Sequence, residues 1–205
     1  SLTPTLEWDT RDDLLRPRRG VFASTSLEYA FPVFAADANF LKLKLSGSAY
    51  RPLGRGLVAA GLRLGVIEPL STLGDDPANL QVPLGARFFA GGRTTHRAFD
   101  TDLLGVPGQT LDEDGDAIGG TAQVLLNVEL EHPLYRFVSG VVFVDAGNVW
   151  GEAGAIDLGE ARWGLGAGLR VDTPAGPFRL EYGHKLDREP GEASGQWFLS
   201  FGVPF

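Results

Sequence analysis

The sequence lacks cysteine altogether, which excludes a disulfide scaffold, thiol catalysis and a cysteine-ligated zinc site. Histidine is scarce, and the three residues at positions 96, 132 and 184 fit no zinc motif such as HExxH. Basic residues are outnumbered, with 18 Lys and Arg against 26 Asp and Glu, and the net charge of -8 argues against a nucleic-acid partner. No apolar run approaches the roughly 18–20 residues of a transmembrane helix, which excludes a helical membrane protein but not a membrane β-barrel.

Glycine and aromatic residues are abundant instead. The chain has 28 glycines in 205 residues, about twice the average usage, together with 13 Phe, four Tyr and four Trp. An apolar content of 43% excludes a disordered chain. Many glycines and aromatics with few helix formers favour an all-β protein with tight turns. The length predicts a single domain over residues 1–205.

Strict alternation of side-chain type is the dominant pattern, and a period of two is that of a β-strand. In residues 162–171, for example, the odd positions carry Trp, Leu, Ala, Leu and Val, whereas the even positions carry two arginines and three glycines. The segment lengths suit membrane strands of about 9–11 residues. Nine segments are predicted: 3–10, 20–31, 38–50, 56–67, 119–131, 137–146, 161–172, 177–186 and 196–205.

The connections between these segments alternate between short and long, as they do in outer-membrane barrels. A soluble barrel and a membrane barrel give the same alternation, so the polar face has to decide between them. That face mixes both signs of charge with many glycines, which suits a crowded, wet interior better than a solvent-exposed surface. The pattern therefore predicts a transmembrane antiparallel β-barrel of outer-membrane type, with about 8–9 strands present and with Trp163, Leu165, Leu169 and Leu199 facing lipid.

The long connection at residues 68–118 has no strong strand or helix pattern, and loops of this size are usually functional. It contains Phe89-Ala90-Gly91-Gly92 followed by His96-Arg97-Ala98-Phe99. Other ordered motifs are Asp9-Thr10-Arg11-Asp12 with Pro17 and Gly20, Gly119-Gly120 with Asn127 to Leu134, Phe143-Val144-Asp145-Ala146-Gly147, and the closing stretch from Arg162 to the terminal Phe205.

In these motifs, over nearly the whole chain, the sequence resembles the barrel domain of the BamA/TamA outer-membrane insertase superfamily, the bacterial surface antigen family. It also resembles the translocation barrels of two-partner secretion. Two positions of the long-loop motif depart from the family pattern, with His96 in place of Val and Ala98 in place of Gly, whereas Arg97 and Phe99 are kept. The family barrel has about sixteen strands, so the resemblance implies that this chain is the C-terminal half of a larger barrel. The family's N-terminal periplasmic POTRA domains have no counterpart in the sequence.

The resemblance implies a function in outer-membrane protein insertion or polypeptide translocation, without enzymatic chemistry, in the bacterial outer membrane. Implied partners are outer-membrane lipid, client β-barrels or secreted polypeptides, and POTRA modules or assembly lipoproteins outside this chain. In the family the long loop folds into the lumen, where its arginine meets the aspartate of the F-x-D-x-G motif and a strand glutamate. The loop residues implied are Gly91, Gly92, Arg97 and Phe99, and their luminal partners are Glu129, Asp145 and Gly147.

The last segment, residues 196–205, ends in an aromatic residue, as do the terminal strands that the outer-membrane assembly machinery recognises. The recognition residues implied are Trp197, Leu199, Phe201, Val203 and Phe205. In a membrane this strand must pair with another strand. Pairing with residues 20–31 would close eight strands around a lumen too narrow for the long loop, so we expect the larger barrel.

No catalytic or metal-binding constellation is predicted, and no cofactor. The acidic run at residues 112–116 lacks the closing glutamate of a calcium loop, so a solvated surface loop is expected there. Two other functions stay open: a passive outer-membrane channel or anchor, and a soluble ligand-binding barrel or sandwich. Retention in detergent micelles separates the soluble protein from the membrane proteins. Conductance together with client folding separates a channel from an insertase.

Overall fold

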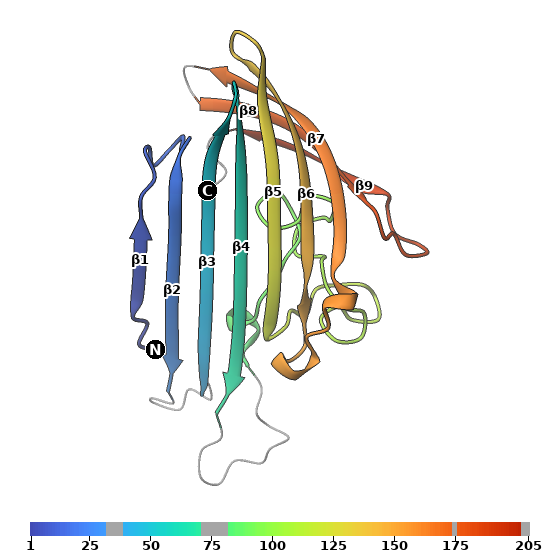
Figure 1. Cartoon of the computed structure of the whole chain (residues 1–205). Helices are drawn as coiled ribbons and strands as arrows, with labels where there is room; N and C mark the ends of the chain where they lie inside the picture. Colours follow the sequence, from blue (N-terminus) through green and yellow to red (C-terminus); the bar gives the residue numbers. More distant parts are fainter. Residues whose placement is uncertain (32–38, 71–81, 174–175, 202–205) are drawn as a thin grey trace.

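A computed structural model describes residues 1–31, 39–70, 82–173 and 176–201 of the chain. These residues form one antiparallel sheet of nine strands in sequence order (Figure 1). The strands are β1 Thr5–Asp9, β2 Gly20–Ala30, β3 Phe40–Leu53, β4 Gly56–Pro69, β5 Ala122–Tyr135, β6 Val138–Trp150, β7 Arg162–Thr173, β8 Gly176–Lys185 and β9 Gly195–Phe201. The all-β fold and the nine predicted segments are therefore confirmed.

The described helices are single 3-10 turns: η2 at Leu84–Ala86, η3 at Ala153–Ala155 and η4 at Leu158–Glu160. Within the described residues, a helix that could cross a membrane is not found.

The two faces of the sheet differ as the alternation predicts. Exposure alternates residue by residue along β2 and β7, so that Leu27, Leu165 and Leu169 are exposed while Arg162 and Arg170 are buried. In a water-soluble sheet the apolar face would be the covered one. Here the apolar face is open and the face with the charged side chains is covered, which is the inside-out arrangement of a membrane barrel.

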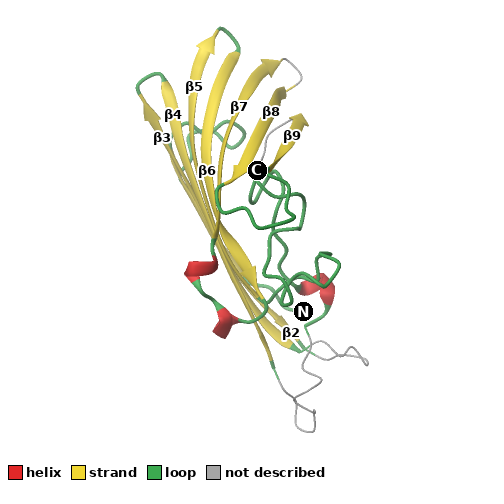
Figure 2. Cartoon of the chain, turned by 90° about the vertical axis from the view of Figure 1, so that its right-hand side faces the viewer, coloured by secondary structure: helices red, strands yellow, loops and turns green. Residues whose placement is uncertain are grey.

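The covering element is the connection between β4 and β5. In Figure 2 this loop lies on the side of the sheet toward which β7, β8 and β9 curl. The buried hydrophobic core lies between loop and sheet, and Phe88, Phe99 and Leu104 of the loop belong to one cluster with Ile67, Leu125 and Val149 of the strands. The core thus belongs to the interior of the curved sheet and not to a second layer of secondary structure.

Several boundaries differ from the predicted ones. β5 continues to Tyr135, although a connection was predicted at 132–136, because the pairing tolerates Pro133 by a register shift between Pro133 and Tyr135. Proline lacks a ladder N–H and is compatible with a strand at such an irregularity. β6 continues past the predicted end at residue 146 to Trp150. The predicted loop 68–118 corresponds to residues 70–121, of which 70 and 82–121 are described.

The sheet is open. Its outermost strands β1 and β9 each pair with one neighbour in the described part of the chain, and both sides of β2 are occupied, by β1 and β3. Closure of an eight-stranded barrel through residues 20–31 is therefore contradicted. The connections 54–55 and 136–137 are short and lie at one end of the strands together with 10–19, whereas the long loop and the connections 151–161 and 186–194 lie at the other end (Figure 1). The lengths separate less cleanly than predicted, because 10–19 has ten residues and 186–194 has nine. We call the end with the connections 10–19, 54–55 and 136–137 the short-turn rim.

Candidate functional site

The site is built on three strands that present polar side chains to the loop. Asn127 and Glu129 lie two residues apart on β5, and Asp145 on β6 is the register partner of Asn127. Because side chains alternate along a strand, Asn127, Glu129 and Asp145 all lie on the covered face. Glu181 reaches the same place from β8, which the curl of the sheet brings round.

The loop reaches these strands through a tight hairpin whose turn contains Gly91 and Gly92. Both have positive φ angles, 113° and 90°, which side chains of L-residues rarely allow. The Gly92 N–H donates to the Phe99 carbonyl at 3.0 Å and the Thr95 N–H donates to the Gly92 carbonyl at 3.3 Å. This hairpin places Arg97 directly over β6.

Arg97 binds Asp145 through three hydrogen bonds. The Arg97 backbone N–H and Nε donate to Asp145 Oδ2 at 2.8 and 2.9 Å, and Nη2 donates to Oδ1 at 2.8 Å. The side chain of Asp145 is 0% exposed and that of Arg97 is 8% exposed. A bidentate guanidinium–carboxylate pair fixes direction as well as distance, so the pair fixes the hairpin in one position on the sheet.

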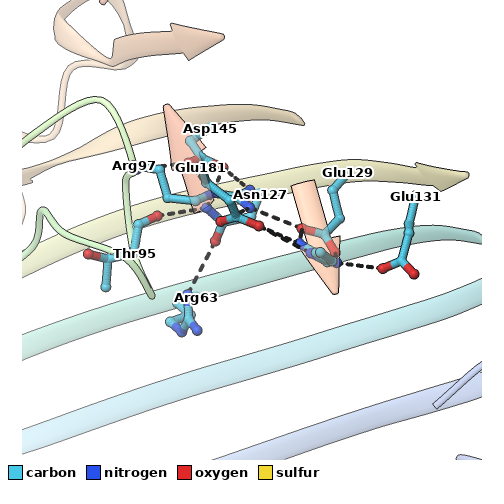
Figure 3. Close-up of polar contacts among 9 residues, drawn as sticks. Arg63, Thr95, Arg97, Asn127, Glu129, Glu131, Asp145 and Glu181 are labelled. Atoms are coloured by element: carbon cyan, nitrogen blue, oxygen red, sulfur yellow. Dashed lines mark hydrogen bonds and ion pairs between the residues drawn. The ribbon is translucent and has the colours of Figure 1, made fainter. Parts of the chain in front are cut away.

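The pair extends into a network that we call the Arg97 cluster: Thr95, Arg97, Asn127, Glu129, Glu131, Asp145, Arg170 and Glu181. Arg97 Nη1 donates to Glu129 Oε2 at 3.0 Å and lies 3.6 Å from Glu181 Oε2. Arg170 donates to Glu129 at 2.8 Å, and it also binds Glu131 and Glu181. Figure 3 shows the carboxylates of three strands converging on the guanidinium of the loop.

Asn127 completes the attachment from the strand side. Its Nδ2 donates to the Thr95 carbonyl at 2.7 Å and to Asp145 Oδ1 at 2.8 Å. One strand amide therefore holds both the loop backbone and the carboxylate that binds Arg97. A buried polar network is stabilising only when its members are satisfied, and here each carboxylate named has at least one cationic partner.

Burial and neighbouring charges shift the pKa values of the loop residues Arg97 and His96 in opposite directions. Burial alone would lower the pKa of Arg97, but the hydrogen bonds and the negative charge of Asp145 raise it, so Arg97 is charged at every accessible pH. Burial lowers the pKa of the neighbouring His96. The neutral ring suits its surroundings, with Nε2 lying 3.2 Å from the Arg162 carbonyl and Nδ1 accepting from the Ala98 N–H at 3.4 Å.

Phe99, the last residue of the loop motif, is buried beside this network. Its ring packs edge-on against His96, with 4.9 Å between the centroids. The Arg162 guanidinium and the Lys185 ammonium lie over the same ring, at 4.9 and 4.1 Å from its centroid. Arg162 in turn pairs with Asp187 and Glu192 of the β8–β9 connection. The sequence analysis did not predict this second ion-pair group, because Asp187 and Glu192 lie in a connection that has no periodic sequence pattern.

Two strand glycines allow the loop to approach the sheet. A side-chain carbon at Gly183 of β8 would contact the carbonyl oxygen of Arg97, and one at Gly164 of β7 would lie 2.7 Å from the Ala98 side chain. The abundance of glycine on the polar face predicted a crowded interior, but not which glycines meet the loop. Gly147 is placed differently, since a side chain there would contact the backbone of Val124 and Leu125 on β5.

Substitution Gly183→Ala should loosen the hairpin while leaving β8 in the sheet. The added methyl group overlaps backbone atoms of Arg97 and Ala98, and overpacking of this kind costs about 1–3 kcal/mol. Hydrogen exchange of the amides in residues 92–99 should accelerate accordingly. The matched control is Gly154→Ala in η3, where a side-chain carbon would meet open space. Equal exchange in both variants would mean that the hairpin does not rest on β8.

The residues predicted for the C-terminal strand lie partly within the described chain. Trp197, Leu199 and Phe201 of β9 are exposed on the apolar face of the sheet. Val203 and Phe205 lie outside the described residues.

The acidic run has a local structural role. Asp112 Oδ1 accepts the backbone N–H groups of Asp114 and Asp116, at 3.0 and 2.9 Å. Among the described residues, no three His, Asp or Glu side chains are grouped so as to hold a metal ion. A cavity of about 330 Å³ adjoins the Arg97 cluster, bounded by the loop tip at Arg93 and Thr94 and by the inner face of β3 and β4.

Comparisons with known proteins give a consistent family assignment. The Omp85 superfamily domain matches residues 1–205. A SAM50-like protein of Schizosaccharomyces pombe is 30% identical over 89% of this chain and 39% of its own length. Outer envelope protein 80 of Arabidopsis thaliana chloroplasts is 33% identical over 52% of this chain and 15% of its own. Outer membrane protein assembly factor BamA of Neisseria meningitidis is 22% identical over 98% of this chain and 28% of its own.

Among solved structures, BamA from Haemophilus ducreyi lacking POTRA domains 1–3 has the same fold. The TM-score is 0.76 at 23% identity, and the match covers 98% of this chain and 42% of that one. The chain thus spans less than half the length of the relatives named here.

Proposed function

The chain belongs to the Omp85 superfamily, and from this premise we propose that it takes part in inserting β-barrel proteins into an outer membrane or in translocating polypeptides across it, without a chemical step. The named relatives support the first part, since BamA of Neisseria meningitidis is an outer membrane protein assembly factor. Residues 1–205 act as one unit in this proposal, because the nine strands form a single sheet and the loop packs on it.

The observation that carries the proposal is the attachment of the long loop by Arg97 to Asp145 and Glu129. The loop covers the charged face of the sheet and fills the space in front of β5 and β6, where a passive channel would need an open path. Arg97 holds the loop in place, Gly91 and Gly92 form the hairpin turn, and the buried Phe99 ring packs against His96. None of these residues performs chemistry in this mechanism.

The edge strand is the second element of the mechanism. β9 pairs with β8 alone in the described part of the chain, so its other edge carries backbone N–H and C=O groups for a further strand. An unpaired edge is costly in lipid and readily adds a strand of another chain. We propose that Trp197, Leu199 and Phe201 present this edge at the lipid surface, where client strands or the assembly machinery pair with it.

We propose that the protein acts in the bacterial outer membrane. Support comes from the bacterial BamA sequence, which aligns with 98% of the chain, compared with 89% for the yeast relative and 52% for the chloroplast relative. Its partners in this proposal are outer-membrane lipid, client β-barrels or secreted polypeptides, and periplasmic POTRA modules or lipoproteins contributed by the rest of the assembly.

Reconstituted folding tests the proposed function. Liposomes that contain the chain should fold a denatured client β-barrel faster than empty liposomes do, measured by the appearance of the folded, heat-sensitive band on a gel. Arg97→Ala should reduce this acceleration, because the loop is no longer held. Arg93→Ala is the matched control, since Arg93 lies on the same loop, is exposed and forms no ion pair with the described residues. Ion conductance without any acceleration of client folding would identify a passive channel instead.

A further inference from the structure

The short-turn rim is basic. Five exposed arginines lie on three connections or at the strand ends beside them: Arg18, Arg19, Arg51, Arg55 and Arg136. None of them forms an ion pair with another of the described residues. The rim therefore presents five guanidinium groups that are outside the ion pairs of the described residues.

The carboxylates of the same rim are already engaged. Asp12 Oδ1 accepts the backbone N–H groups of Arg18 and Arg19, at 2.8 and 3.0 Å. Asp13 accepts the N–H groups of Leu15 and Arg16. The side chain of Arg16 pairs with Asp172, at 3.3 Å. These bonds shape the first connection, and Asp12 and Asp13 keep their negative charges, so the rim is basic because the five arginines outnumber these two carboxylates.

Apolar side chains stand between these arginines. Six of them are exposed by 54% to 68%: Leu14, Leu15, Leu53, Leu134, Tyr135 and Phe137. Arg136 also lies over the Tyr135 ring, 5.7 Å from its centroid. Alternating guanidinium and apolar groups along a rim are typical of a surface that enters the headgroup region of a membrane.

The opposite end of the strands carries the opposite charge. The described long connections expose many more carboxylates than basic groups, among them Asp102, Glu113, Asp114, Asp157 and Glu189. The net charge of -8 is thus unevenly distributed, and the basic rim is not part of a generally basic surface. Because basic groups are attracted to anionic lipid surfaces, a charge difference between the two ends of the barrel gives the two ends different affinities for an anionic membrane surface.

We propose that the short-turn rim binds phospholipids with anionic headgroups in the adjacent leaflet. Arginine pairs bidentately with phosphate, and the interleaved apolar side chains bury themselves at the boundary of the acyl chains. A lipid surface fits better than an acidic protein because the arginines follow the edge of the sheet over three connections and do not form one compact patch. The inference rests on the membrane placement of the barrel and not on the insertion of clients.

The tryptophans of the chain provide a test at each rim. Trp8 is exposed near the short-turn end of β1 and, as the partner of Ala23, lies on the outer face. Trp163 is exposed at the other end, at the start of β7, whereas Trp150 is completely buried. The double variant Trp163→Phe/Trp197→Phe reports lipid contacts at Trp8, and Trp8→Phe/Trp197→Phe reports those at Trp163. Trp150 adds the same background to both.

Each variant is reconstituted into phosphatidylcholine vesicles with increasing amounts of phosphatidylglycerol that carries brominated acyl chains, which quench tryptophan on contact. Both leaflets have the same composition, so a difference in quenching between Trp8 and Trp163 is caused by the protein surface at each rim and not by the lipid on that side. We expect phosphatidylglycerol to be preferred at Trp8, by about fivefold for each arginine engaged, and not at Trp163. Added salt should reduce the preference.

The triple substitution Arg18→Gln/Arg19→Gln/Arg55→Gln should abolish most of the preference at Trp8. Arg188→Gln, an exposed arginine of the β8–β9 connection, should leave it unchanged. If the triple variant does not fold, the salt titration of the protein with its arginines intact tests the same proposal, because the preference at Trp8 should fall as salt is added. Equal quenching by the two lipids at Trp8, or an equal preference at both tryptophans, would overturn the proposal. The measurement contains no client, so its outcome is separate from that of the client-folding experiment.

Discussion

Replacing Arg97 with alanine should release the long loop from the sheet while the nine strands stay paired. The residue is buried, and its removal leaves Asp145 without the guanidinium that neutralises it. Breaking a buried pair by removing one partner costs about 3–5 kcal/mol. The strand ladder does not involve residue 97. Hydrogen exchange should therefore accelerate strongly in the loop and little in β5 and β6, whereas Arg93→Ala should leave both unchanged.

A double-mutant cycle tests whether Arg97 and Asp145 act together. Asp145→Asn removes the charge but keeps the shape, and we expect a loss of loop protection similar to that of Arg97→Ala. The two substitutions combined should be little worse than either alone, because residues in direct contact are not additive. Strictly additive losses would show that the two side chains do not meet in the membrane-embedded protein.

Placing a charge on the open apolar face should be nearly as damaging. Leu169 lies near the middle of β7 and is 48% exposed. If this face meets hydrocarbon, Leu169→Arg should destabilise the folded protein in vesicles by about 2–4 kcal/mol. The measurement is a denaturant titration followed by tryptophan fluorescence.

Leu158→Arg is the control for this substitution. Leu158 is 67% exposed but belongs to η4, in a connection outside the strands. A surface substitution of that kind usually changes stability by less than about 0.5 kcal/mol. If both variants were equally mild, the apolar face would not be in contact with lipid, and the inside-out arrangement of the barrel would have to be reversed.

Most of the sheet could be predicted because a strand imposes a period of two on its side chains. Alternation at residues 162–171 assigned Trp163, Leu165 and Leu169 to one face, and the structure exposes the same three. The resemblance to the insertase superfamily, based on ordered motifs, is confirmed by the family match over the whole chain. The pairing implied for Arg97 needed both the strand alternation and the family resemblance. The alternation put Asp145 and Glu129 on the inner face, and the family motif supplied the loop arginine.

The parts that could not be predicted depend on where an aperiodic segment lies in space. Gly183 lies against the Arg97 backbone, so a strand meets a loop that is far away in sequence. Neither segment carries a sequence pattern that predicts this contact. The pairing of Arg162 with Asp187 and Glu192 has the same origin. Strand ends were misplaced where a residue that usually stops a strand is accommodated, as Pro133 is by a register shift.

The most direct test of the central claim, that the long loop is held against the inner face of the sheet, is a disulfide between the two. The chain has no cysteine of its own, so an introduced pair reports without background. A side-chain carbon at Gly164 would lie 2.7 Å from that of Ala98, and a small shift brings such a pair into disulfide range. In protein reconstituted into vesicles, Ala98→Cys/Gly164→Cys should crosslink within one chain and shift mobility on a non-reducing gel. Ala98→Cys/Leu165→Cys, with the second cysteine on the outer face of the same strand, should not. Failure of the first pair to crosslink, or equal crosslinking of both pairs, would contradict the account.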